Sequence, residues 1–130
     1  MRNEYDEDGF SRTIAKATSV SLFREDHGIL TLSVGFDYGD KGAQGLGLVS
    51  LDVRDPVAER RVGVEWAIEY ITSVMEAFGV DALEKIKGRT VYVLHREEDP
   101  YIAGLEPLPT ERGTRVVFSE MFDRYGVGVS

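Results

Sequence analysis

Alternating apolar and polar residues predict strands in the first part of the chain. The clearest alternation covers residues 29–38, where Leu30, Leu32, Val34 and Phe36 fall on one face of a strand. Gly35 interrupts this strand and indicates a bulge or the close approach of another group. We predict neighbouring strands over residues 11–23 and 46–53, with a turn at residues 24–28 and a glycine-rich loop at residues 39–47 between them.

A helical period replaces the alternation in the middle of the chain. It predicts one long amphipathic helix from about Ala58 to Phe78, which Gly79 ends as the C′ residue. The apolar stripe of this helix consists of Val64, Ile68, Ile71, Met75 and Phe78, joined by Trp66, Ala67, Tyr70 and Val74. Because the stripe is wide, we expect it to serve both the core and a subunit interface, so we predict a homo-oligomer.

The last third of the chain returns to short elements. Asp81 and Glu84 have the spacing of a capping box and predict a short helix that ends at Gly88. We predict further strands over residues 89–97, 99–108 and 114–118, then a last short helix over residues 119–126. The fold class is therefore α+β: an antiparallel sheet with one long helix packed on a face and one or two short helices. We expect residues 1–10 to form a flexible acidic tail and residues 11–130 to form a single domain.

Composition narrows the classes of partner. The chain has 130 residues and a net charge of −8, which argues against binding to duplex nucleic acid because such binding needs a basic face. It has no cysteine, and no apolar run is long enough to span a membrane. The start of the chain is polar and acidic, unlike a signal peptide. We therefore expect a cytoplasmic protein that binds no membrane and needs no metal or other cofactor.

The sequence contains few residues that could act together in catalysis. His27 lies beside Glu25 and Asp26, but residues adjacent in a tight turn point in different directions, so a turn is the favoured interpretation. An enzyme remains the alternative, for instance a nucleotide hydrolase that uses His27 with Asp37 and Asp40. We predict no catalytic residue.

Binding candidates are of three kinds. Glycines let backbone N–H groups approach a ligand, and an amide side chain both donates and accepts, so Gln44, Gly45 and Gly47 are candidates in the loop. A loose hairpin loop is the alternative interpretation. Phosphate binding favours arginine, and base stacking favours an aromatic ring. These residue types select Arg60, Arg61, Arg112 and Arg115 for charge, and Tyr101 and Phe118 for stacking.

Three short motifs carry a family resemblance. The sequence has D-H-G-I at residues 26–29, D-Y-G at residues 37–39 and Q-G-x-G at residues 44–47, followed by an amphipathic helix and a V-x-V strand. This combination resembles a small phage protein family related to the anti-Thoeris sponge proteins, which bind cyclic ADP-ribose-type signals or cyclic oligonucleotides without cleaving them. The chain departs from that pattern at Leu46, where an aromatic residue is expected, and at Leu105–Glu106, where Gly-His is expected.

The resemblance implies a phage anti-defence protein in the host cytoplasm. Such a protein sequesters a small nucleotide-derived immune signal and does not cleave it. A protein–protein interaction module is the main alternative, and a nucleotide-processing enzyme is a further one.

Overall fold

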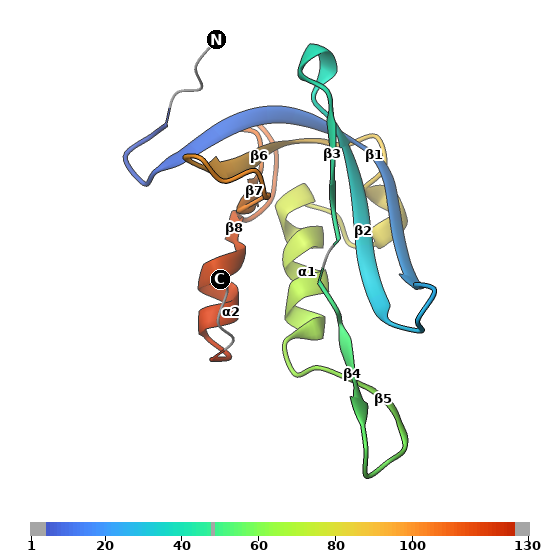
Figure 1. Ribbon diagram of the computed structural model, residues 1–130. Coiled ribbons are helices and arrows are strands. Elements are labelled where there is room, and N and C mark those ends of the chain that lie inside the picture. The colour runs from blue at the N-terminus through green and yellow to red at the C-terminus, as the bar shows by residue number, and fades with distance from the viewer. Residues whose placement is uncertain (1–4, 48, 127–130) are drawn as a thin grey trace.

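The sheet is built around one long strand, β1. A computed structural model describes residues 5–47 and 49–126 and confirms the α+β class (Figure 1). Residues 1–4 of the predicted tail lie outside the described residues. The elements are β1 (Phe10–Arg24), β2 (Leu30–Asp37), β3 (Ala43–Leu46), β4 (Asp52–Asp55), β5 (Arg60–Gly63), α1 (Ala67–Phe78), β6 (Thr90–Arg96), β7 (Gly104–Glu106), β8 (Val116–Val117) and α2 (Phe118–Asp123). Single 3₁₀ turns occur at Gly39–Lys41 and Leu83–Lys85.

Six of the strands form one antiparallel sheet in the order β3-β2-β1-β6-β7-β8. This sheet curves around α1, and α2 lies beside α1 on the same face (Figure 1). Strands β4 and β5 form a separate hairpin that projects from the rest of the fold (Figure 1). The concave face of the sheet therefore holds both helices.

The curvature of the sheet follows from the pairing of β1 with two different strands. Its first half, residues 10–16, pairs with β6, and its second half, residues 16–24, pairs with β2. The register shifts between Ala17 and Ser19, opposite Gly35. A Cβ atom at Gly35 would lie 2.6 Å from Ser19 Oγ. The prediction that Gly35 marks a bulge or a close approach is thus confirmed by the register shift and by the short distance to the Ser19 side chain.

The core lies between the sheet and α1. Leu32, Val34 and Phe36 are buried on one face of β2, as their alternation predicts, and the Phe36 ring stacks on Phe78 of α1 at a centroid distance of 6.1 Å. The side chains of Val91 and Val93 from β6 are also buried. Apolar burial of this extent is the main favourable term in folding.

The long helix is shorter than predicted, since it begins at Ala67 instead of Ala58. Residues 60–63 form β5, because Asp55 accepts backbone hydrogen bonds from Val57 and Ala58 and Glu59 takes a left-handed conformation (φ 56°), which closes a hairpin. The predicted third strand, residues 46–53, is also divided: β3 ends at Leu46 and β4 begins at Asp52.

The buried stripe of α1 also differs from the predicted one. The helix buries Ala67, Tyr70, Val74, Ala77 and Phe78. Ile68, which we placed in the stripe, is 72% exposed. Four of the five buried residues, all except Ala77, belong to the predicted stripe, so the core contact is its Tyr70–Val74 side and excludes Ile68.

The N-terminal segment touches the sheet. Asp6 accepts a hydrogen bond from the backbone N–H of Phe10 and forms an ion pair with Arg12. Phe10 is buried against Leu94 and Val117. Strand β1 thus starts at the last residue of the segment that the sequence assigns to the tail.

Candidate functional site

A small apolar cavity lies beside β3, where the strand faces α1 and α2. Its volume is about 170 Å³. The lining includes five of the nine predicted binding residues, which come from three separate parts of the chain: Gln44, Gly45, Gly47, Tyr101 and Phe118. Leu46, Val49, Tyr70, Ile102 and Phe122 complete it. The predicted loop residues and both predicted stacking residues thus line one cavity.

Aromatic rings form the wall on the helix side. The Tyr70 ring lies 5.4 Å from the Phe118 ring and 6.2 Å from the Phe122 ring, measured between centroids. Behind them, Trp66 packs edge-on against Phe122 at 4.8 Å. Tyr70 belongs to α1 and both Phe118 and Phe122 belong to α2, so helices form this wall.

Tyr101 differs from the other aromatic candidate in its exposure. Its side chain is 65% exposed, whereas that of Phe118 is buried against Tyr70. Asp99 holds the Tyr101 backbone, because the carboxylate accepts a hydrogen bond from the Tyr101 N–H at 2.9 Å. Tyr101 is therefore a ring at the mouth of the cavity, and Phe118 is part of its wall.

Gln44 is fixed by three hydrogen bonds inside the protein. Its Oε1 accepts from the Tyr38 hydroxyl at 2.7 Å and lies 2.8 Å from His95 Nε2, and its Nε2 donates to the Pro100 carbonyl at 2.6 Å. Burial raises the pKa of Tyr38 to about 12, so its hydroxyl stays protonated and donates. Burial also lowers the pKa of His95, which favours the neutral ring with its proton on Nε2. Gln44 thus ties β2, β3 and β6 together.

A second, polar hollow lies on the other side of Gln44. It has a volume of about 460 Å³, and its lining includes Tyr38, Lys41, His95 and Arg96. Glu98 and Asp99 line it as well. Because Gln44 lines both, the apolar cavity and the polar hollow adjoin one another.

The loop glycines have different roles. Gly47 has φ 155°, and a Cβ atom there would lie 2.9 Å from the Leu32 carbonyl oxygen and 3.0 Å from Ser33 Cα. A Cβ atom at Gly45 would meet no described atom within 4 Å. Gly45 also alternates with Gln44 and Leu46, so that Cβ atom would point away from the face that carries Leu46. Gly47 is therefore required by the fold, whereas packing gives no reason for Gly45.

The four predicted arginines, all within the described residues, do not line the apolar cavity. Arg61 lies on the projecting hairpin, where its Nε donates to the buried carboxylate of Asp52 at 2.9 Å. Arg60 is paired through its backbone with Asp55 on the same hairpin. Arg112 is exposed and lines a hollow near the end of α1.

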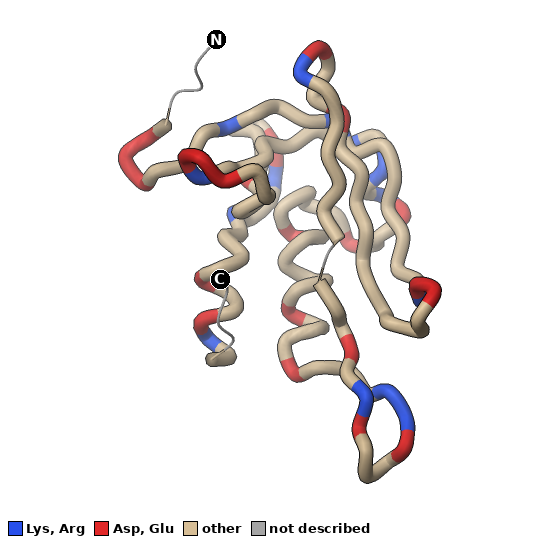
Figure 2. Tube along the Cα trace, in the orientation of Figure 1, with Lys and Arg blue, Asp and Glu red and all other residues tan. Residues whose placement is uncertain are grey.

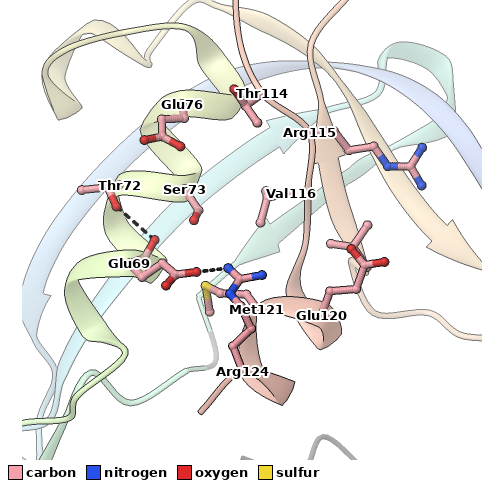
Figure 3. A pocket seen from close by; sticks show the side chains of 11 residues that line it. Glu69, Thr72, Ser73, Glu76, Thr114, Arg115, Val116, Glu120, Met121 and Arg124 are labelled. Atoms are coloured by element: carbon pink, nitrogen blue, oxygen red, sulfur yellow. Dashed lines mark hydrogen bonds and ion pairs between the residues drawn. The ribbon is translucent and has the colours of Figure 1, made fainter.

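Arg115 takes part in a separate set of ion pairs. It bonds Glu106 at 3.1 Å and Asp8, and it lines a hollow of about 350 Å³ between α1 and α2 (Figure 3). In this hollow Arg124 forms an ion pair with Glu69 (Figure 3). The charges of Arg61 and Arg115 are thus matched by acids of the protein itself, as the abundance of acidic residues permits (Figure 2).

The catalytic alternative is not assembled as one site. His27 lies in the exposed turn before β2, where its Nδ1 is 3.2 Å from Glu25 Oε2. Asp37 ends β2 and accepts a hydrogen bond from the Gly39 N–H. Since β2 has 8 residues and a strand rises about 3.3 Å per residue, His27 lies roughly 25 Å from Asp37 and Asp40. The part of the chain that the structure describes holds no group of three or more His, Asp or Glu residues placed to bind a metal.

Tyr70 is an aromatic residue of the cavity lining that the sequence does not single out as a binding candidate. It was assigned to the apolar stripe of the helix, and its ring is indeed buried there. A signal was present in the sequence, because a tyrosine in an apolar stripe carries a hydroxyl that needs a partner. Among residues 5–47 and 49–126, the Tyr70 hydroxyl has none.

Comparisons with known proteins give no further guide. No protein-family model matches the sequence, and no curated protein or solved structure is detectably similar. Among the described helices, none is long and apolar enough to cross a bilayer. The resemblance to the phage sponge proteins therefore stays a prediction.

Proposed function

We propose that the protein binds a small nucleotide-derived ligand and holds it without cleaving it. The observation that carries the proposal is the convergence of Gln44, Gly45, Gly47, Tyr101 and Phe118 on one cavity. Following the resemblance, the ligand is a cyclic ADP-ribose-type or cyclic oligonucleotide immune signal, and the protein is a phage anti-defence factor of the host cytoplasm.

The sizes of the two adjoining spaces suit such a ligand. A cavity of about 150 Å³ is known to take one benzene ring, so a volume of about 170 Å³ suits one ring and not a whole nucleotide. The rest of the ligand would lie outside, across Tyr101 and toward the polar hollow. Lys41 and Arg96 line that hollow and are cations that suit phosphate. This assignment replaces the four arginines selected from the sequence.

Sequestration needs only mass action. A protein present in excess of the signal, with a dissociation constant below the threshold of the host sensor, lowers the free signal below that threshold. The separation of His27 from Asp37 and Asp40 is in keeping with binding without cleavage, because no water could be activated jointly by these groups.

The decisive experiment is native mass spectrometry with a panel of cyclic oligonucleotides and cyclic ADP-ribose isomers. We expect one adduct class, and we expect the ligand to be recovered with unchanged mass after heat denaturation. Recovery of a product would indicate an enzyme. The absence of any adduct would refute the proposal.

A pair of matched variants tests whether the cavity is the site. Ile102 lines the cavity, so Ile102→Phe adds ring volume where the ligand ring would sit. Ile14→Phe makes the same change on an exposed position of β1 outside the lining. We expect the first variant to lose the adduct and the second to keep it. Equal binding by both would place the site elsewhere.

A protein–protein interaction module is the second candidate function. It is favoured by the hairpin of β4 and β5, which projects from the fold (Figure 1). Val53 and Val57 on this hairpin are exposed. Exposed apolar side chains on a protruding element suit a partner protein better than a small ligand. This candidate gains support if the mass spectra show no nucleotide adduct.

A further inference from the structure

The second half of β1 has a neighbouring strand on one side only. Residues 10–16 pair with β6 on one side of β1, and residues 16–24 pair with β2 on the other. The β6 side is closed as far as Ala17, whose N–H donates to the Arg89 carbonyl and whose carbonyl accepts from the Gly88 N–H. Among the described residues, no backbone pairs with this side of residues 18–24, which therefore form an open edge of the sheet (Figure 1).

The backbone groups of this edge point outward in a regular order. The Glu25 N–H donates to the Ile29 carbonyl at the start of the β1–β2 ladder. Because antiparallel ladders alternate, every second residue counted back from Glu25 directs its N–H and C=O groups toward β2. The residues between them, Val20, Leu22 and Arg24, direct these groups toward the open edge. Such a row of unpaired groups is a template for another strand.

The open edge lacks most of the features that protect sheet edges from pairing. Proteins shorten their edge strands or place charges and proline on them. The outer strands of this sheet, β3 and β8, have 4 and 2 residues. Residues 18–23, in contrast, read T-S-V-S-L-F and contain no charge, glycine or proline, and Leu22 and Phe23 are 44% and 42% exposed. Beyond the bulge at its start, this edge is thus built to be paired and not to be shielded.

The two ends of the open edge carry opposite charges. Glu25 and Asp26 lie in the turn that follows β1. At the other end Lys16 lies in β1, and Lys87 and Arg89 belong to the segment that closes the β6 side. The 3₁₀ turn before that segment, Leu83–Lys85, adds one acid and one base and leaves the balance unchanged. A second copy related by a two-fold axis brings the acidic end of each chain to the basic end of the other.

The length of the edge selects the register of such a pairing. An added antiparallel strand has to stop where residues 88–89 occupy the edge. The longest pairing that fits sets residues 18–24 of one copy against residues 18–24 of the other, with the axis at Ser21. Val20 then lies opposite Leu22 of the second copy, and each such pair exchanges two backbone hydrogen bonds, so the two pairs make about four. The acidic turn of each copy comes to residues 87–89 of the other.

We propose that two copies of the chain associate through the open edge of β1, antiparallel about a two-fold axis at Ser21, so that their six-stranded sheets join into one. This assigns the predicted homo-oligomer contact to β1 instead of the apolar stripe of α1. The proposal does not depend on the proposed function. Strand β2 separates the open edge from β3, so both apolar cavities stay accessible in the dimer.

Sedimentation equilibrium tests the association and the position of its axis. We expect the wild type to have twice the chain mass of 14.5 kDa. Ser21→Lys and Ser21→Glu each set two like charges directly opposite one another at the axis, which should raise the dissociation constant of the dimer roughly fivefold. Ser21 is exposed, so both variants should keep the wild-type circular dichroism spectrum and Tm.

Mixing the two variants gives the sharper test. Native mass spectrometry, with the lysine variant labelled with heavy nitrogen, separates the two homodimers from the heterodimer, which form in a ratio of roughly 1:2:1 when pairing is unbiased. Because lysine meets glutamate only in the heterodimer, we expect it to exceed this share at least about fivefold. Ile14→Lys and Ile14→Glu are the matched control: Ile14 is exposed on the half of β1 that pairs with β6, so their mixture should be unbiased.

Three results would overturn the proposal. The first is a wild type that keeps the mass of a single chain up to about 0.1 mM. The second is an unbiased mixture of the Ser21 variants, which would place the contact between copies elsewhere. The third is an equal bias in the Ser21 and Ile14 mixtures, which would show that charge alone, and not its position on the open edge, decides the pairing.

Discussion

Gly47 offers the most direct test of the way the glycine-rich segment is built. In Gly47→Ala the new Cβ atom would lie 2.9 Å from the Leu32 carbonyl oxygen and 3.0 Å from Ser33 Cα. Both neighbours are backbone atoms of β2, so neither can rotate away. The backbone conformation, with φ 155°, adds strain for any residue with a side chain.

The magnitude follows from these contacts. Forcing an extra carbon into a packed site lowers stability by about 1–3 kcal/mol. Alanine also restricts the unfolded chain more than glycine does, which raises stability by about 0.5 kcal/mol. We therefore expect Gly47→Ala to lower the free energy of unfolding by about 2 kcal/mol, and its Tm by roughly 5–10 °C. Urea unfolding followed through the fluorescence of Trp66, the one tryptophan of the chain, measures this change.

Gly45→Ala is the matched control, because its Cβ atom would meet no described atom within 4 Å and would point away from the cavity face. We expect its free energy of unfolding to be unchanged or raised by about 0.5 kcal/mol. Its ligand affinity should also be unchanged. If both alanine variants were equally stable, the structural role assigned to Gly47 would be wrong.

Three further predictions concern buried polar groups. Tyr70→Phe should raise the free energy of unfolding by about 1 kcal/mol in urea titrations without ligand, because it removes an unpaired hydroxyl; a loss of stability would contradict this. Hydrogen bonds from Arg61 hold the pKa of Asp52 below its ordinary value, so its stabilising contribution is complete above about pH 4 and is lost as the pH falls through the folded pKa. Asp52→Asn should lower the free energy of unfolding at neutral pH. It should also make the Tm fall less steeply as the pH drops below about 4, which a series of Tm measurements at different pH values would show. Burial lowers the pKa of His95, so stability should fall as the pH drops below about 6.5, and His95→Gln should remove that part of the pH profile.

The strands could be predicted where one face alone is buried. In β2 the period of two is unmistakable, because Leu32, Val34 and Phe36 face the core while their neighbours do not. The start of α1 could not be predicted in the same way. Valines and arginines at residues 57–64 fit a helical spacing, and the turn that overrides it depends on the side chain of Asp55 and the left-handed Glu59.

The candidate site was predictable in part for a similar reason. Gln44, Tyr101 and Phe118 were selected by residue type, and the fold brings them together on one cavity. The arginines were selected on the same ground, but their contacts depend on tertiary structure: Arg61 is bonded to Asp52, and Arg115 is bonded to Glu106. Sequence spacing alone does not reveal which charged residue has a partner. The two cations that line the polar hollow, Lys41 and Arg96, therefore could not be selected from the sequence.

The change of partner along β1 has a consequence for the speed and order of folding. The half of β1 that pairs with β2 is joined to it by a tight turn, so this hairpin closes a short loop. The other half meets β6 across a long stretch of chain, with Ser11 and His95 separated by 84 residues. Pairs so distant in sequence close slowly, because much chain entropy is lost before their contacts form. We therefore expect the β1–β2 hairpin to form first and the pairing of β6 with the other half of β1 to limit the rate of folding.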